Sequence, residues 1–281
     1  MVKALVIVVL CLTLPVPGGT SAQHSYAVPP TLEVIHRPLD AILDANVRDG
    51  MVYYRALQSV RGRLDRYVAS LDVPADTYAS WTREAQIAFW LNAYNAFVLK
   101  TVIDHYPIRG RSAAYPAGSI RQVPGAFDRI RHRAAGRSLT LDQIEKEVLP
   151  AFNEPRLYLA LGRGAVGSGR LRSEAYSGSV LARQLDAVAE DFLTHKQMIS
   201  IDRQNDVVSV TPIFSWREQE FVRAYDPGAS GPYAQRSPIE RAIIAFIAPR
   251  VLPLEKEFLE RNTFRLVFHD VDWRPNDLTG G

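Results

Sequence analysis

Cysteine is almost absent from this sequence of 281 residues, because Cys11 is the only one. It lies in the first 22 residues, which we predict to be removed, so the mature chain has none. This excludes disulfides, thiolate metal sites and cysteine nucleophiles from the mature protein. The chain must rely on a hydrophobic core, and it is long enough to bury one in a single domain.

Long hydrophobic runs are also scarce, and the one present is "ALVIVVLCLTL" at 4–14. Lys3 precedes it, and the small residues Thr20 and Ala22 stand before a cut at Gln23, which is the layout of a secretory signal peptide. The run is too short for a transmembrane helix, which needs about 20 residues. We therefore predict a cleaved signal peptide over 1–22, a periplasmic or secreted protein, and no stable membrane anchor after cleavage.

A strong excess of charge is missing, because the formal net charge is only +3. That value is too small to indicate nucleic-acid binding. The segment 109–137 nevertheless holds seven arginines against one acid, Asp128, and is either a solvated surface or a patch for an anionic ligand or surface. The histidines (24, 36, 105, 132, 195 and 269) show no i, i+3 or i, i+4 spacing, so we predict no metal site.

The residue pattern is helix-rich, and no regular βαβ alternation is present. We predict a helix-rich α+β fold with a small, mainly antiparallel sheet: a flexible lead-in over 23–35, a single domain over 36–276 and a tail over 277–281. The expected helices are 36–46, 82–106 (capped by Thr82, ended by Pro107), one after a capping box at Thr140, one capped by Ser179, 214–224 and 238–248. The expected strands are two hairpins, 127–141 and 198–211, a buried strand at 156–161 and a last strand within 263–273.

The glycines Gly162, Gly164 and Gly167 spell G-x-G-x-x-G after an apolar run. In a dinucleotide-binding turn a helix begins at once, with its N-terminus facing the pyrophosphate. Here the helical periodicity begins only near residue 180. We therefore predict neither nucleotide binding nor any other cofactor.

Ser168 stands between two glycines and is a candidate nucleophile, although the G-x-S-x-G pattern of a nucleophile elbow is missing. Tyr158, His269 or Asp272 could assist it, since a serine needs a base. The alternative is that Ser168 is a turn residue.

Several separated stretches together resemble one family, the domain of unknown function 547. They are "VRDGMVYYRAL" (47–57), "REAQIAFWLNAYNAFVLKTVIDHYP" (83–107), "SLTLDQIEKEVL" (138–149), "EPRLYLAL" (154–161), "LRSEAYSGSVLARQLDAVAEDFL" (171–193), "PIFSWREQEF" (212–221) and "DWRPN" (272–276). The resemblance implies no agreed activity. It does imply that Tyr158 stands where the family often has histidine, and that Arg163 and Ser168 stand where it has two cysteines. Any thiol chemistry of the family would then be lost, and Arg163 and Arg172 could adapt the same cavity to an anion.

Other polar and aromatic residues of these stretches are open to two interpretations. Asn92 and Asn95 lie three residues apart on one helix face, and they either bracket neighbouring loops or line a pocket. Trp90, Tyr94 and Trp216 are expected in the core rather than on a binding platform. Asp272 could hold a loop or serve a site.

We therefore predict a non-catalytic or degenerate binding protein of the cell envelope, for a small anionic or peptide-like ligand. The predicted pocket lies between the helix 82–106, the strand 156–161 and the following loop. Its candidate ligand-binding residues are Asn92, Tyr94, Asn95, Tyr158, Arg163, Arg172 and Asp272. The alternatives are a hydrolase or transferase that uses Ser168, and a structural interaction module without a pocket.

Overall fold

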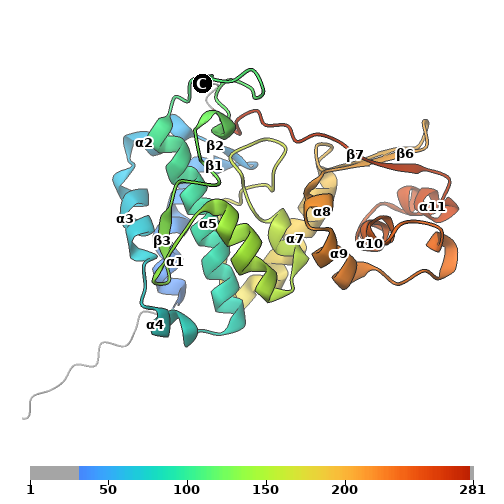
Figure 1. Cartoon of the computed structure of the whole chain (residues 1–281), viewed down its shortest axis with the longest axis horizontal. Helices are drawn as coiled ribbons and strands as arrows, with labels where there is room; N and C mark the ends of the chain where they lie inside the picture. The colour runs from blue at the N-terminus through green and yellow to red at the C-terminus, as the bar shows by residue number, and fades with distance from the viewer. Residues whose placement is uncertain (1–31, 279–281) are drawn as a thin grey trace, which may run out of the picture.

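A computed structural model describes residues 32–278, and the predicted signal peptide lies outside them. Its α-helices are α1 (Leu32–Asn46), α2 (Tyr54–Ser59), α3 (Gly62–Ser70), α4 (Ala75–Ala79), α5 (Arg83–His105), α6 (Leu141–Gln143), α7 (Leu181–Thr194), α8 (Ile213–Trp216), α9 (Glu218–Tyr225), α10 (Pro238–Ile247) and α11 (Pro253–Arg261). Short 3-10 helices are η1 (Ile120–Gln122), η3 (Leu149–Phe152), η4 (Pro155–Leu159), η5 (Gly178–Val180) and η6 (Gly231–Tyr233), and η2 (Ile144–Val148) is a π-helix. Figure 1 shows α1 to α5 gathered at one end of the molecule and α8 to α11 at the other.

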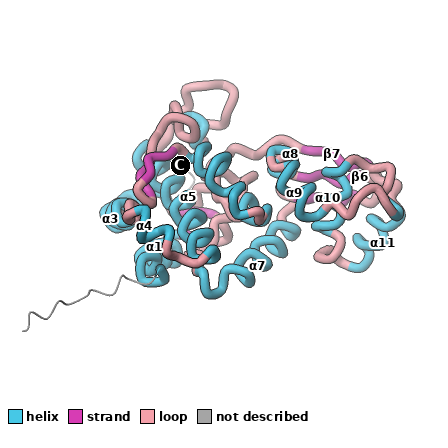
Figure 2. Tube along the Cα trace, turned by 60° about the horizontal axis from the view of Figure 1, so that its bottom comes forward, coloured by secondary structure: helices cyan, strands magenta, loops and turns pink. Residues whose placement is uncertain are grey.

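The strands within residues 32–278 form three small sheets, which confirms the predicted helix-rich α+β class. β1 (Val47–Arg48) pairs antiparallel with β2 (Met51–Val52), and β3 (His132–Ala134) with β4 (Arg137–Leu139). β5 (Ile199–Asp202) pairs antiparallel with β6 (Val207–Val210), and β6 pairs in parallel with β7 (Arg265–Phe268). In Figure 2 the strands occupy little of the trace beside the helices.

The central helix α5 matches its prediction closely. The Thr82 side chain accepts a hydrogen bond from the Ala85 N–H at 3.3 Å, so it caps the helix as expected. Most residues of α5 are buried, and it contacts α1, α2, α3 and α6. Trp90 and Tyr94 are fully buried in the core, as predicted.

The predicted strand at 156–161 is wrong, because η4 occupies most of it. Pro155 fixes the first helical position, and the Glu154 side chain accepts a hydrogen bond from the Arg156 N–H at 3.2 Å. The apolar run is buried against α7 and α9 rather than inside a sheet. A short apolar run does not distinguish these two kinds of burial.

Three further expectations need correction. The first helix begins at Leu32, inside the predicted lead-in. Ser179 does not cap α7, which begins at Leu181 after η5. The helix expected at 214–224 is interrupted at Arg217, which separates α8 from α9, and α11 was not predicted.

The segment after β7 crosses back to the first hairpin, as the red trace in Figure 1 shows. The Val52 N–H donates to the Asn276 carbonyl at 2.8 Å, and the Leu278 N–H donates to the Val52 carbonyl at 2.9 Å. The Tyr54 hydroxyl donates to the Asn276 side chain at 2.8 Å. The predicted boundary between domain and tail therefore falls inside a bonded segment.

Candidate functional site

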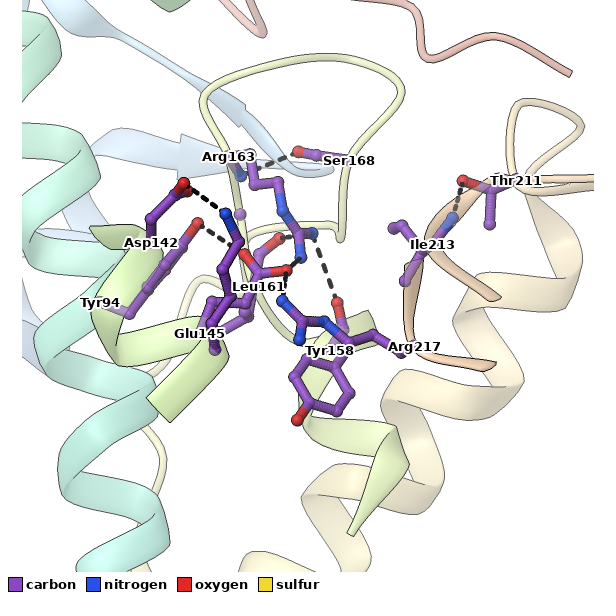
Figure 3. A network of polar contacts seen from close by, with 12 residues as sticks. Tyr94, Asp142, Glu145, Tyr158, Leu161, Arg163, Ser168, Thr211, Ile213 and Arg217 are labelled. Carbon is purple, nitrogen blue, oxygen red and sulfur yellow. Dashed lines mark hydrogen bonds and ion pairs between the residues drawn. The ribbon is translucent and has the colours of Figure 1, made fainter. Parts of the chain in front are cut away.

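Three buried charged residues from distant parts of the sequence meet at one point. Glu145 Oε1 accepts a hydrogen bond from Arg163 Nη2 at 2.8 Å and another from Arg217 Nη2 at 3.0 Å. The three residues are at most 8% exposed. Figure 3 shows both guanidinium groups directed at this carboxylate. Glu145, Arg163 and Arg217 together carry one net positive charge in a place where water screens it weakly, and the Glu220 carboxylate approaches Arg217 Nη1 at 4.0 Å.

Local backbone structure places each of the three side chains. Glu145 lies in the π-helix η2, directly after the predicted capping box, in which the Gln143 N–H donates to Thr140 Oγ1 at 3.1 Å. Arg163 lies in the loop after η4, and Arg217 stands at the junction of α8 and α9 with φ −123° and ψ 33°. π-Helical turns are rare and are often found at functional sites.

The charge cluster controls the protonation of Glu145. Burial by itself would raise the pKa of this carboxyl, but the charges and hydrogen bonds of Arg163 and Arg217 lower it from 4.5 to about 2. Glu145 is therefore ionised at neutral pH and is a weak base.

Two tyrosines complete the cluster. The Tyr94 hydroxyl donates to Glu145 Oε2 at 3.3 Å, and the Tyr158 hydroxyl donates to Glu220 Oε1 at 3.3 Å. The Arg217 guanidinium lies over the Tyr158 ring, 4.7 Å from its centroid. Burial and the Glu220 charge raise the pKa of Tyr158, so its hydroxyl stays protonated.

A cleft of about 550 Å³ opens over this cluster, and we call it the arginine cleft. Its lining holds four cations against two acids and two aromatic side chains: Arg121, Phe127, Asp142, Glu145, Lys146, Arg163, Trp216 and Arg217. Trp216 is 44% exposed, which corrects the expectation that it belongs to the core.

The cations of the arginine cleft are not all neutralised by protein groups. Within residues 32–278, Arg217 Nε is buried and has no hydrogen-bond partner, and Nη1 of the same side chain contacts Glu220 at 4.0 Å. Among the described residues, the Arg121 guanidinium has neither a hydrogen bond nor an ion pair, and it lies 4.2 Å from the Trp273 ring centroid and 4.5 Å from that of Phe127. Lys146, by contrast, pairs with Asp142 at 2.6 Å.

The two helix asparagines bracket the backbone. Asn92 exchanges two hydrogen bonds of 2.8 Å with the backbone N–H and C=O of Tyr176. Asn95 accepts from the Gly162 N–H at 2.8 Å and donates to the Ala160 carbonyl at 3.2 Å. Of the two interpretations offered by the sequence, these contacts correspond to the bracket.

The Ser168 side chain likewise forms its hydrogen bonds with backbone groups. Its hydroxyl donates to the Ala165 carbonyl at 2.8 Å and accepts from the Arg163 N–H at 3.0 Å. None of its hydrogen bonds to the described residues reaches a histidine or a carboxylate. Catalysis by Ser168 stays a prediction that these contacts do not support.

The last glycine of the motif, Gly167, and the nearby Gly169 serve close packing. A Cβ atom added to Gly167 would lie 2.4 Å from the Asp272 backbone nitrogen, and one added to Gly169 would lie 2.3 Å from the Leu159 carbonyl oxygen. No helix begins here, since the next helical element is η5. These glycines therefore let three backbone segments approach one another.

The remaining candidates lie away from the arginine cleft. Asp272 pairs with Arg274 at 2.5 Å, and its carbonyl accepts the Gly167 N–H at 2.9 Å. Arg172 pairs with Glu174 at 2.5 Å and lines a second cavity, together with Ser168. The predicted residues thus divide between two cavities and a set of structural contacts.

Sequence reasoning missed Glu145, Arg217 and the exposure of Trp216. A signal for the first two was present. Glu145 falls among the apolar positions Leu141, Ile144 and Val148, and Arg217 falls between Phe214 and Phe221 at helical spacing. A charged side chain at a core position of a helix needs a buried partner of opposite charge or a hydrogen-bond partner.

Residues 32–278 contain neither a candidate metal site nor a candidate transmembrane helix. No group of three or more His, Cys, Asp or Glu side chains in this range could hold a metal ion. None of the helices in the same range combines the length and the apolar character needed to cross a bilayer.

Of the comparisons with known proteins, one gives a match, and it covers part of the chain. No curated protein and no solved structure matches the sequence. The family model described as "Protein of unknown function, DUF547" matches residues 78–193, a span that includes α5, Glu145, Arg163 and most of α7. The resemblance is confirmed over residues 78–193, which match the model of this family of unknown function.

Proposed function

We propose that this protein is an exported, non-catalytic binding protein of the cell envelope that holds a small organic anion in the arginine cleft. Of the two ligand classes predicted from the sequence, anionic and peptide-like, the cleft favours the anion. The observation that carries the proposal is the excess of cations in the cleft lining. Among the described residues the Arg217 guanidinium is incompletely bonded and the Arg121 guanidinium is unpaired.

The lining suggests how such a ligand would be held. Arginine forks match the geometry of carboxylate and phosphate, and each charged hydrogen bond contributes about 1.5–3 kcal/mol. Trp216 and Phe127 offer aromatic faces beside those cations. The Arg163 guanidinium is 5.8 Å from the centroid of the Trp216 ring, so anion and ring contacts lie close together. A ligand that joins an anionic group to a flat or apolar body fits both features.

The chemistry of the lining supports binding rather than catalysis. Among the described residues that line the cleft there is no serine, threonine, cysteine or histidine. Its two carboxylates are already paired, Glu145 with arginines and Asp142 with Lys146. Neither carboxylate is therefore free to act as the general base that proton transfer needs.

The test is titration of the protein with phenyl phosphate and with benzoate. Calorimetry and tryptophan fluorescence measure the binding. We expect both anions to bind, with affinity that falls as salt is added, because exposed charges are screened. The uncharged analogue benzyl alcohol should bind at least tenfold more weakly. Trp216→Phe should reduce the fluorescence change, since Trp216 is the tryptophan in the cleft lining; Trp273, which packs against Arg121, accounts for any remainder.

Matched arginine variants locate the site. Arg121→Gln removes an unpaired cation of the cleft and should weaken anion binding about tenfold. Arg129→Gln removes an exposed arginine outside the lining and should leave affinity unchanged. Equal affinities of these two variants, or failure of the folded wild-type protein to bind either anion, would refute the proposal.

A further inference from the structure

A second cavity of the described residues lies apart from the arginine cleft. It has a volume of about 590 Å³ and is lined by the β1–β2 turn, the loop 165–174, α7 and the chain just after α7. The arginine cleft and this cavity share no lining residue. We call it the loop cavity. Its size falls within the ~300–1,000 Å³ range of small-ligand pockets.

The lining of the loop cavity includes a group of buried apolar side chains. Leu159, Leu171, Val188, Phe192 and Met198 line it, and each is at most 6% exposed. They come from η4, the following loop, α7 and the segment before β5. A ligand that reaches them would gain about 25 cal/mol for each Å² of apolar surface removed from water.

Charged side chains of both signs also line the cavity, and they are paired with one another. Arg170 bonds to Asp49 at 2.7 Å and to Asp191 at 2.6 Å, and Arg172 bonds to Glu174 at 2.5 Å. The side chains are between 26% and 91% exposed. Exposed ion pairs contribute about 0–1 kcal/mol, so a ligand can replace one partner of such a pair at little cost.

The position of Arg170 is fixed by the backbone beneath it. Gly50 has φ +76°, and a Cβ atom there would lie 2.3 Å from Arg170 Cγ. The arginine stem therefore crosses directly over the β1–β2 turn, and its guanidinium spans from that turn to α7. A cation and the Asp191 carboxylate therefore lie side by side in the lining that also holds the apolar side chains.

We propose that the loop cavity binds a short apolar peptide with free ends. The peptide carboxylate would pair with Arg170 in place of Asp49, and the peptide ammonium would pair with Asp191. Apolar side chains of the peptide would contact Phe192 and Leu171. The loop cavity offers both a cation and a carboxylate to a ligand, whereas cations predominate in the arginine cleft. The inference does not depend on the function proposed for the arginine cleft.

The test is calorimetric titration of the full chain with tri-leucine, its N-acetylated form and its C-amidated form. We expect tri-leucine to bind and each capped form to bind at least tenfold more weakly. Arg170→Gln should weaken tri-leucine binding and remove the penalty of C-amidation. Asp191→Asn should remove the penalty of N-acetylation. Equal binding of all three peptides, or no binding to the folded protein, would overturn the inference.

Control variants separate this site from its surroundings and from the arginine cleft. Arg183→Gln and Glu190→Gln change exposed residues of α7 outside the cavity and should not alter peptide affinity. Asp49→Asn, at a side chain that is 91% exposed, should fold normally and bind tri-leucine at least as well as wild type. Arg121→Gln should also retain peptide binding. If Arg121→Gln abolishes it, the peptide occupies the arginine cleft as an anion and the loop cavity assignment is wrong.

Discussion

At the scale of single residues, the protein keeps a carboxylate in its interior by surrounding it with donors. Glu145 receives hydrogen bonds from Arg163, Arg217 and Tyr94. Removing one partner of a buried ion pair leaves the others uncompensated, which costs more than the pair contributes. Glu145 therefore contributes to the stability of the fold, and it also lines the candidate binding cleft.

Glu145→Gln should destabilise the protein by about 3–5 kcal/mol at neutral pH, because two buried arginines lose their counter-charge. Urea unfolding measures this difference. Glu147→Gln, at an exposed position of the same π-helix, should change stability by about 0.5 kcal/mol or less.

The same carboxylate predicts a pH dependence. The folded pKa of Glu145, about 2, lies below the ordinary 4.5, so its contribution is complete above about pH 4.5 and is lost as the pH falls toward 2. The stability gap between wild type and Glu145→Gln should therefore narrow across this window. A gap that stays constant from pH 7 to pH 2.5 would show that the arginines do not hold the carboxylate ionised.

At the scale of elements, α5 acts as a scaffold that holds the two segments around η4 and η5. Asn92 fixes the backbone at Tyr176, and Asn95 fixes Ala160 and Gly162 on either side of the turn after η4. Arg163 follows directly in the chain. The position of the arginine cleft thus depends on polar side chains of a buried helix.

Asn95→Ala should destabilise the fold by about 2–4 kcal/mol, because it leaves a buried N–H and a buried C=O without partners and opens a small void. Thermal unfolding measures the loss. Gln219→Ala, an exposed change on α9, should shift the melting temperature little. If Asn95→Ala melts like Gln219→Ala, the bracket does not hold the loop.

Elements that depend on local interactions were predicted correctly from the sequence, and elements that depend on distant contacts were not. The helix α5, its Thr82 cap and the capping box at Thr140 were predicted correctly, since each depends on residues within one turn. The strand predicted at 156–161 was wrong, because its apolar character reflects burial against distant helices. Ser179 failed as a cap for a related reason: η5 delays the start of α7 to Leu181.

At the scale of the whole molecule, the last described residues tie its two ends together. The carbonyls of Asp272 and Arg274 accept the N–H groups of Gly167 and Val166, each at 2.9 Å. Asn276 donates to the Gly50 carbonyl at 2.8 Å. One segment therefore joins β7, the glycine loop and the first hairpin, which also borders the loop cavity.

Asn276→Ala should loosen this junction. We expect faster hydrogen exchange at the Val52, Val166 and Gly167 amides, since their acceptors lie in the segment that Asn276 anchors. Arg265→Ala, an exposed change in β7, should leave exchange at these amides unaltered. Unchanged exchange in Asn276→Ala would mean that the backbone contacts alone hold the segment.

The sequence by itself determined the fold class, the central helix, the hairpins β3–β4 and β5–β6, and the family resemblance of residues 78–193, because these depend on periodicity, caps and local motifs. It also indicated Arg163 as a cavity residue through the family resemblance. Only the tertiary structure decided that Glu145 and Arg217 meet Arg163, that Trp216 is exposed beside them, and that the glycines serve close backbone packing. Those outcomes depend on contacts between residues as many as 105 positions apart, from Gly167 to Asp272, and such contacts leave no local pattern.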